Sequence, residues 1–183
     1  MKLTVVVFFS IMFLFIVGFI IFFSQEAEID QNRNWVIEIA IYPVGHSSDT
    51  YFIQIDENST IQARRGTRRD FVITTIHARF LNEIHSAAES ILSDDEMQTV
   101  LSLAQELEII GVIDEIGIAD GTWEVILIYN EARYAMDYRV ANLVVNHLGE
   151  TIHEGAYPLY HYEAFLRLVD EVIRLSPLEL RMY

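Results

Sequence analysis

The sequence predicts an α+β protein: an N-terminal single transmembrane helix followed by one compact domain of mainly antiparallel sheet with about three packed helices. Three observations support this class. An uncharged apolar run begins the chain, short segments with apolar residues at alternate positions follow, and longer segments with helical spacing fill much of the second half. A chain of 183 residues buries enough surface for one core without disulfides, so we expect a single domain after the anchor.

The apolar run Leu3–Phe23 contains 21 residues and no charged side chain. As a helix it would be about 31 Å long, which matches a hydrocarbon core of about 30 Å. A cleaved signal peptide has a shorter apolar core and a small-x-small cleavage site, whereas here Phe22 or Gln25 would stand where a small residue is needed. We therefore expect an uncleaved signal-anchor over residues 1–23, a juxtamembrane linker over residues 24–34 and the α+β domain over residues 35–183.

The residues that flank the apolar run predict its orientation. Lys2 and the amino terminus precede it, and Glu26, Glu28 and Asp30 follow it. Because positive flanks remain in the cytoplasm, we expect a cytoplasmic N-terminus and an extracytoplasmic C-terminal domain. This makes the protein a single-pass protein of the cell membrane, and the lipid bilayer its first partner, through Leu3–Phe23.

The charge balance limits the other partners. The chain has 12 Lys+Arg against 27 Asp+Glu, and Lys2 is its only lysine, so residues 24–183 carry a net charge of −16. Such a domain repels phosphates, which argues against nucleic acid and against an anionic lipid surface as partners. The absence of cysteine excludes a disulfide framework and a thiol nucleophile. Another envelope or membrane protein is the partner that we expect.

Alternation of apolar and polar residues predicts an antiparallel meander at the start of the domain. Its strands are Trp35–Tyr42, Tyr51–Asp56 and Thr60–Arg64, with a turn of Asp56-Glu57-Asn58-Ser59 between the last two. Further strands are predicted at Asp70–His77, at Trp123–Tyr129, through Tyr134, Met136 and Tyr138, and at Leu178–Met182. Asn130–Arg133 is expected to link two of them as a hairpin.

Helical spacing and end signals predict the helices. Ser93–Glu96 forms a capping box before a helix over Asp94–Glu108, and Gly149 ends a short stripe that begins at Val140. A third helix carries Tyr162, Phe165, Leu166, Val169, Val172 and Ile173, with expected ion pairs Glu163–Arg167 and Asp170–Arg174. Two segments are less regular. Phe80–Ile91 has apolar residues at helical spacing and is expected to form a loop or short helix, and Ile109–Gly121 a buried connector.

One cluster of potential metal ligands lies near the C-terminus. It consists of His147, His153, Glu154 and His161. Imidazole and carboxylate groups are ordinary ligands of zinc and related ions, although this spacing matches no compact motif. His147 also continues an apolar stripe, where a packed core histidine is the alternative. The neighbouring Tyr157, Tyr160 and Tyr162 are either an aromatic contact surface or ordinary packing.

A second cluster consists of arginines that bracket Gly66-Thr67. Its members are Arg64, Arg65, Arg68 and Arg69. Guanidinium groups bind carboxylates and phosphates through paired hydrogen bonds, so the cluster is a candidate site for an anion or an acidic partner. The alternative is that these arginines pair with the acidic residues of the protein itself.

The function predicted from these patterns is a membrane-anchored extracytoplasmic binding or interaction module without catalytic activity and without a cofactor. No Gly-rich phosphate loop, nucleophile elbow or paired-carboxylate motif occurs in the sequence. Two alternatives stay open. One is a metal-dependent hydrolase that uses the His/Glu cluster, and the other is an accessory subunit of a membrane complex.

Overall fold

A computed structural model of the chain describes residues 33–43, 49–68, 81–115, 123–137, 144–145, 151–152 and 157–180. All of them belong to the second of the two units into which the chain divides, Asn32–Tyr183. Within the described residues, no helix is both long enough and apolar enough to span a membrane. The predicted anchor Leu3–Phe23 and most of the predicted linker lie outside the described residues.

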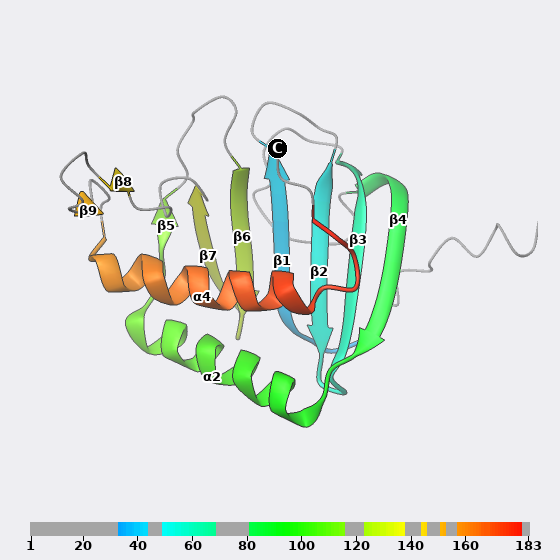
Figure 1. The fold of residues 1–183 in the computed structure, drawn as a ribbon, viewed down its shortest axis with the longest axis horizontal. Helices are drawn as coiled ribbons and strands as arrows, with labels where there is room; N and C mark the ends of the chain where they lie inside the picture. The colour runs from blue at the N-terminus through cyan, green and yellow to red at the C-terminus, as the bar shows by residue number, and fades with distance from the viewer. Residues whose placement is uncertain are drawn as a thin grey trace, which may run out of the picture. The chain divides into compact units, whose positions relative to one another are not determined.

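The described domain is built on a seven-stranded sheet in the order β4-β3-β2-β1-β6-β7-β5 (Figure 1). The strands are β1 (Trp35–Pro43), β2 (Thr50–Asp56), β3 (Thr60–Arg68), β4 (Leu81–Ile91), β5 (Asp114–Glu115), β6 (Trp123–Tyr129) and β7 (Ala132–Asp137). Neighbouring strands are antiparallel except β5 and β7, which are parallel. The predicted α+β class with a mainly antiparallel sheet is therefore confirmed.

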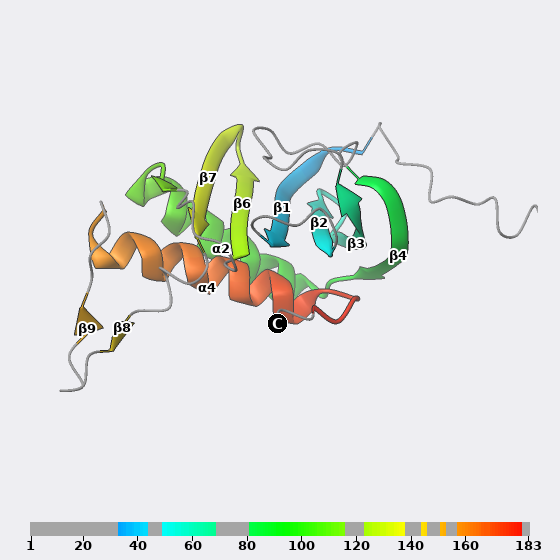
Figure 2. The ribbon, with the colours of Figure 1, turned by 90° about the horizontal axis from the view of Figure 1, so that it is seen from above.

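Two helices, α2 (Asp94–Ile110) and α4 (Leu159–Leu175), cross the strands on one face of the sheet (Figures 1 and 2). Helix α2 connects β4 at one edge of the sheet to β5 at the other. Its 17 residues extend about 25 Å. Six strand spacings measure about 29 Å, so the helix is nearly as long as the sheet is wide.

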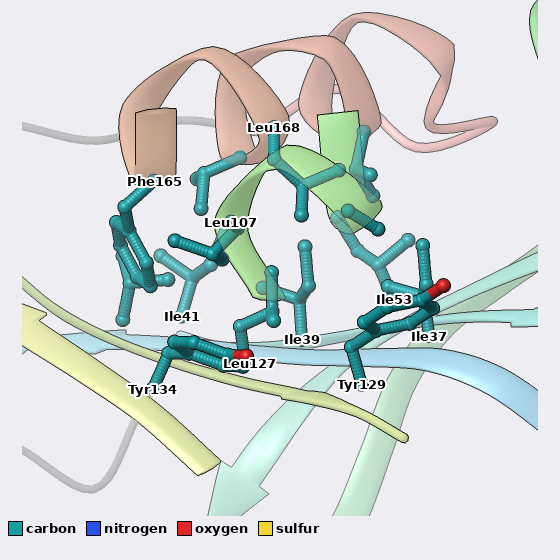
Figure 3. Close-up of a cluster of buried hydrophobic side chains, with 14 of the residues drawn as sticks. Ile37, Ile39, Ile41, Ile53, Leu107, Leu127, Tyr129, Tyr134, Phe165 and Leu168 are labelled. Carbon is teal, nitrogen blue, oxygen red and sulfur yellow. The ribbon is translucent and has the colours of Figure 1, made fainter. Parts of the chain in front are cut away.

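The main core fills the space between this face and the two helices (Figure 3). Alternate residues of β1, namely Ile37, Ile39 and Ile41, are fully buried there. Helix α2 contributes Val100, Ala104 and Leu107, and α4 contributes a wider stripe that includes Phe165 and Leu168. Apolar side chains at every second position of the strand and at every third or fourth position of the helices thus form one buried layer.

Several local predictions are confirmed. The Ser93 side chain accepts from the Glu96 backbone amide over 3.3 Å, and the Glu96 carboxylate accepts from the Ser93 amide over 2.9 Å, which completes the capping box. The hairpin between β6 and β7 turns at Asn130 and Glu131, both with positive φ. In the turn after β2, Asp56 Oδ1 accepts from the amides of Asn58 and Thr60, each over 2.9 Å.

The most consequential correction concerns β4, because Phe80–Ile91 was expected to be a loop or short helix. Residues Leu81–Ile91 form the longest described strand and pair with β3. The strand has exposed residues on both faces, so its sequence lacks the apolar alternation that identifies a half-buried strand. The predicted strand Asp70–His77 lies outside the described residues.

Three further predictions are wrong at described residues. Val144 does not continue a helix but lies in β8 (Val144–Val145), paired with β9 (Thr151–Ile152), as suits adjacent β-branched residues. Leu178 and Leu180 are not in a strand; the Leu178 amide donates to Ser176 Oγ over 3.2 Å, which replaces a ladder bond. Helix α2 continues to Ile110, and Ile109 is 87% exposed rather than part of a buried connector.

The expected ion pairs within α4 are replaced by other pairs. Arg167 binds Glu106 of α2 over 2.6 Å, and Arg174 binds Glu171 over 2.6 Å. The Arg167–Glu106 pair joins the two helices. The expected pairs were derived from residues three or four positions apart on one helix, so they did not include a contact between helices. About three helices were expected, and α2 and α4 are the two among the described residues.

Candidate functional site

The sheet face opposite the helices carries most of the buried polar side chains. Along β1, β2 and β3, residues that alternate with the core positions face this side, and Gln54, Arg64 and Arg68 are at most 2% exposed. A smaller apolar cluster shares the face. It contains Ala40, Tyr42, Phe52, Leu81, Ile126 and Ala135.

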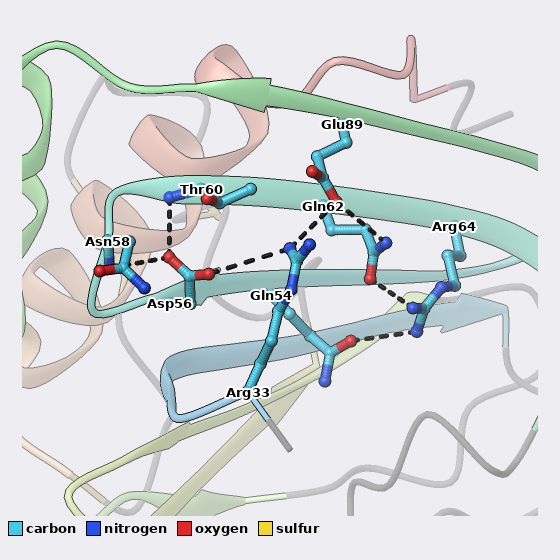
Figure 4. Close-up of polar contacts among 8 residues, drawn as sticks. All are labelled: Arg33, Gln54, Asp56, Asn58, Thr60, Gln62, Arg64 and Glu89. Carbon is cyan, nitrogen blue, oxygen red and sulfur yellow. Dashed lines mark hydrogen bonds and ion pairs between the residues drawn. The ribbon is translucent and has the colours of Figure 1, made fainter. Parts of the chain in front are cut away.

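Arg64 lies at the centre of a hydrogen-bonded network on this face (Figure 4). Its Nη1 donates to Gln54 Oε1 over 3.3 Å, and its Nη2 donates to Gln62 Oε1. Gln54 in turn donates from Nε2 to Glu38 Oε2 over 2.8 Å. The guanidinium of Arg64 is therefore joined to a carboxylate through an amide that relays the hydrogen bond from β3 through β2 to β1.

The same network continues to the edge of the sheet. Gln62 Nε2 donates to Glu89 Oε2 over 3.3 Å, and Arg33 Nη1 donates to the same oxygen over 3.0 Å. Arg33 also lies 3.8 Å from Asp56 Oδ2, and its guanidinium is 5.8 Å from the ring centre of Trp35. Arg33, two residues before β1, is thus bound to both β2 and β4.

Burial lowers the pKa of Arg64, and the nearby charge of Arg33 lowers it further, while Glu89 opposes the shift. An arginine stays protonated even when its pKa falls moderately, so Arg64 is a buried cation held by two glutamine side chains. These contacts engage the two terminal nitrogens of the guanidinium, whereas its buried Nε makes no hydrogen bond within the part of the chain that the structure describes. The arrangement links strands β1, β2 and β3 to one another through side-chain hydrogen bonds.

Arg68 lies on the same face, in a second polar group with Tyr42 and Glu124. Its guanidinium is 4.4 Å from the ring centre of Tyr42, and its Nη2 donates to the carbonyl oxygen of Pro43 over 3.1 Å. Glu124 stands opposite Tyr42 in the β1–β6 pairing. Burial, followed by the Glu124 carboxylate, raises the pKa of Tyr42, so the phenol stays neutral at physiological pH.

The predicted arginine cluster does not converge on one point. Arg65 points to the helix side of the sheet, where its Nε donates to Asp49 Oδ1 over 2.8 Å and its guanidinium is 5.7 Å from the ring centre of Tyr51. Arg64 and Arg68 face the opposite side, and Arg69 lies outside the described residues. Binding of an anion by these residues stays a prediction. For Arg65, the structure shows the alternative, an ion pair with an acidic residue of the protein itself, Asp49.

Of the predicted metal ligands, the structure describes His161, in the first turn of α4. Its ring stacks on Tyr157 at 6.0 Å between centres and meets Tyr160 edge-on at 4.5 Å. His147, His153 and Glu154 lie outside the described residues. In the ranges that the structure describes, no three His, Asp or Glu side chains gather into a possible metal site, and the metal site stays a prediction.

The three tyrosines near His161 divide between the two roles considered for them. Tyr162 is 1% exposed and packs in the core, and its hydroxyl accepts from the Tyr157 amide over 3.2 Å. The Tyr157 hydroxyl accepts from the Asp114 amide over 3.2 Å. Tyr160, at 57% exposed, is the one of the three that faces solvent.

Strand β4 combines exposed apolar side chains with a position at the edge of the sheet. It is the terminal strand of the sheet, and no described strand pairs with its outer edge (Figures 1 and 2). Ile91 is 79% exposed and Ile84 is 39% exposed, although both are large apolar residues. An edge strand of this length presents a row of backbone groups that can pair with another chain, which makes β4 the candidate binding site.

Comparison with models of known protein families found no match, and comparison with curated proteins found none. The sequence signal for β4 is weak, because Ile84 and Ile91 are separated by six residues that include two alanines and a glutamate, residue types that are depleted in strands. The helical spacing of Ile84, Ala87 and Ile91 obscured it.

Proposed function

We propose that the chain is a membrane-anchored extracytoplasmic binding module without catalytic activity, and that it takes a protein partner on the outer edge of β4. The observation that carries this proposal is the exposure of Ile91 at the end of an 11-residue edge strand. Strand addition supplies affinity through backbone hydrogen bonds and selectivity through alternate side chains. The apolar run Leu3–Phe23 supports the anchor, since its length suits one membrane crossing.

The neighbouring contacts support a preformed edge. Through Gln62 and Arg33, the Glu89 side chain is bound to the network that extends to β1. A docking strand that is already ordered loses less conformational freedom on binding than a loop does. The buried polar face therefore contributes rigidity to the binding edge.

Binding at β4 is tested with a photo-reactive residue placed at Ala87, which is exposed on the edge strand, in the full chain in its native membrane. The control places the same group at Ser102, which is exposed on α2. We expect a discrete protein adduct from position 87 that is lost in an Ile91→Glu variant. No adduct, or the same adduct from both positions, would contradict binding at the edge.

The membrane part of the proposal needs a separate experiment. We expect the full chain to stay with membranes during alkaline carbonate extraction, and added protease to reach the domain from the outer side of intact cells. Release of the whole chain by carbonate, or protection of the domain until cells are lysed, would contradict the anchor or its orientation, respectively.

A further inference from the structure

We propose that the partner of β4 is an extended segment with basic side chains, which adds as a strand along Ser86–Ile91. This inference rests on the proposed function and deepens it by naming the chemistry of the segment that docks. Three features limit which segment can bind there: the β3–β4 register, the exposed side chain of Ile91 and the acidic residues near β4.

The register selects the C-terminal part of β4. Over Ser86–Ile91, β4 pairs residue for residue with Thr60–Arg65. Toward the other end of β4 the pairing shifts twice, between Arg65 and Gly66 and between Thr67 and Arg68. Such irregularities twist an edge away from an incoming strand. The regular part has six residues and is about 20 Å long, which suits an added strand of similar length.

The side chains of this run define a pattern for the partner. Glu89 and Ile91 are two residues apart, so they lie on the same face of the strand. The Glu89 side chain is 42% exposed, and Ile91 is 79% exposed. A strand paired with this edge therefore places an apolar residue beside Ile91 and a basic residue beside Glu89, also two positions apart.

The charge near the run favours a basic segment over a second copy of this chain. Asp94 and Asp95 are exposed immediately beyond β4, and the Glu83 side chain at its other end is 72% exposed. Arg33 is engaged with Glu89 over 3.0 Å. Because residues 24–183 carry a net charge of −16, pairing β4 with β4 of another copy would bring two acidic domains together.

The test uses the full chain in neutral detergent micelles and a fluorescent peptide, acetyl-Lys-Thr-Val-Thr-Lys-Thr-amide, whose basic and apolar residues share one face. A matched peptide has Glu in place of Lys. We expect the Lys peptide to bind at least about tenfold more tightly than the Glu peptide, measured by fluorescence anisotropy. Its affinity should fall severalfold when salt rises from about 50 mM to about 500 mM.

Two controls separate strand addition from general attraction to an acidic protein. A Lys peptide with two adjacent N-methylated residues keeps its charge but cannot complete the ladder, and we expect it to lose most of the binding. The Glu89→Gln variant keeps a hydrogen-bond acceptor and should bind at least about fivefold more weakly, whereas Glu163→Gln, on the exposed surface of α4, should change binding by less than about twofold.

Equal binding of the Lys and Glu peptides, or equal effects of Glu89→Gln and Glu163→Gln, would overturn the basic partner. Full binding of the N-methylated peptide would overturn strand addition. If an adduct forms at Ala87 but the Lys peptide neither binds nor competes, this inference fails and the proposed function stands. An adduct with a second copy of this chain, at twice its mass, would also overturn the inference.

Discussion

Gly66 lies where β3 and β4 come into close contact at a shift in their register. A Cβ at this position would overlap the carbonyl oxygen of Glu83, a backbone atom that cannot rotate away. The glycine therefore allows the irregular end of β4 to approach its neighbour.

We expect Gly66→Ala to destabilise the protein by about 1–3 kcal/mol, because β4 must move away from β3 to accommodate the methyl group. The measurement is chemical denaturation of the full chain. Ser86→Ala, in the regularly paired part of β4, is the control and should change stability by less than about 0.5 kcal/mol. An effect of Gly66→Ala no larger than that of the control would argue against the close approach.

Glu96 links the α2 capping box to pH. Its hydrogen bond from the Ser93 backbone, followed by that from the Ser93 hydroxyl, lowers its pKa below the ordinary value of 4.5. A carboxyl group with a lowered pKa in the folded state contributes stability above its unfolded pKa, and this contribution is lost as pH falls through the folded pKa.

The thermal stability of the protein should therefore decrease below about pH 4.5, with a smaller decrease in a Glu96→Gln variant. The glutamine can still accept a hydrogen bond from the Ser93 amide but does not titrate. The melting temperatures of the wild-type protein and the Glu96→Gln variant should therefore converge as the pH falls. Parallel pH profiles of the two proteins would show that the capping carboxylate makes no pH-dependent contribution.

At the scale of single elements, β3 carries arginines with two different environments. Arg64 is 1% exposed and donates to Gln54 and Gln62, whereas the Arg65 side chain is 34% exposed and binds Asp49. Adjacent residues of a strand point to opposite faces, so two neighbouring arginines need not share a function.

Arg64→Met should cost about 1–3 kcal/mol of folding free energy, because it leaves the buried Gln54 oxygen and the half-buried Gln62 oxygen without their donor. Arg65→Met removes an ion pair that is partly exposed to solvent and should cost less than about 1 kcal/mol. Denaturation of the two variants in parallel measures the difference. Equal costs would mean that the buried network contributes no more than the surface pair.

Elements with strong local signals were predictable from the sequence. The capping box of α2, the apolar stripe of α4 and the alternation in β1 each depend on residues within one helix or one strand. β4 was missed because both of its faces contact solvent, which removes the alternation. The Arg167–Glu106 pair was missed because its partners are 61 residues apart.

At the scale of the whole molecule, the fold class was predictable but the strand order was not. β1 is paired on one side with the next strand in the chain and on the other with β6, which is separated from it by the whole of α2. Apolar periodicity specifies which face of a strand is buried but not which strand lies beside it. The candidate site depends on that order, because β4 is an edge only when β6 takes the place beside β1.

The central position of β1 has a mechanical consequence. β1 is the first strand after the predicted linker and is flanked by antiparallel partners over most of its length. A force that pulls its N-terminal end along the strand loads both hydrogen-bonded ladders in shear, so many bonds must break together. Force spectroscopy with the same handle at residue 33 should therefore give a higher rupture force than at residue 91, where traction peels β4 from the sheet one bond at a time.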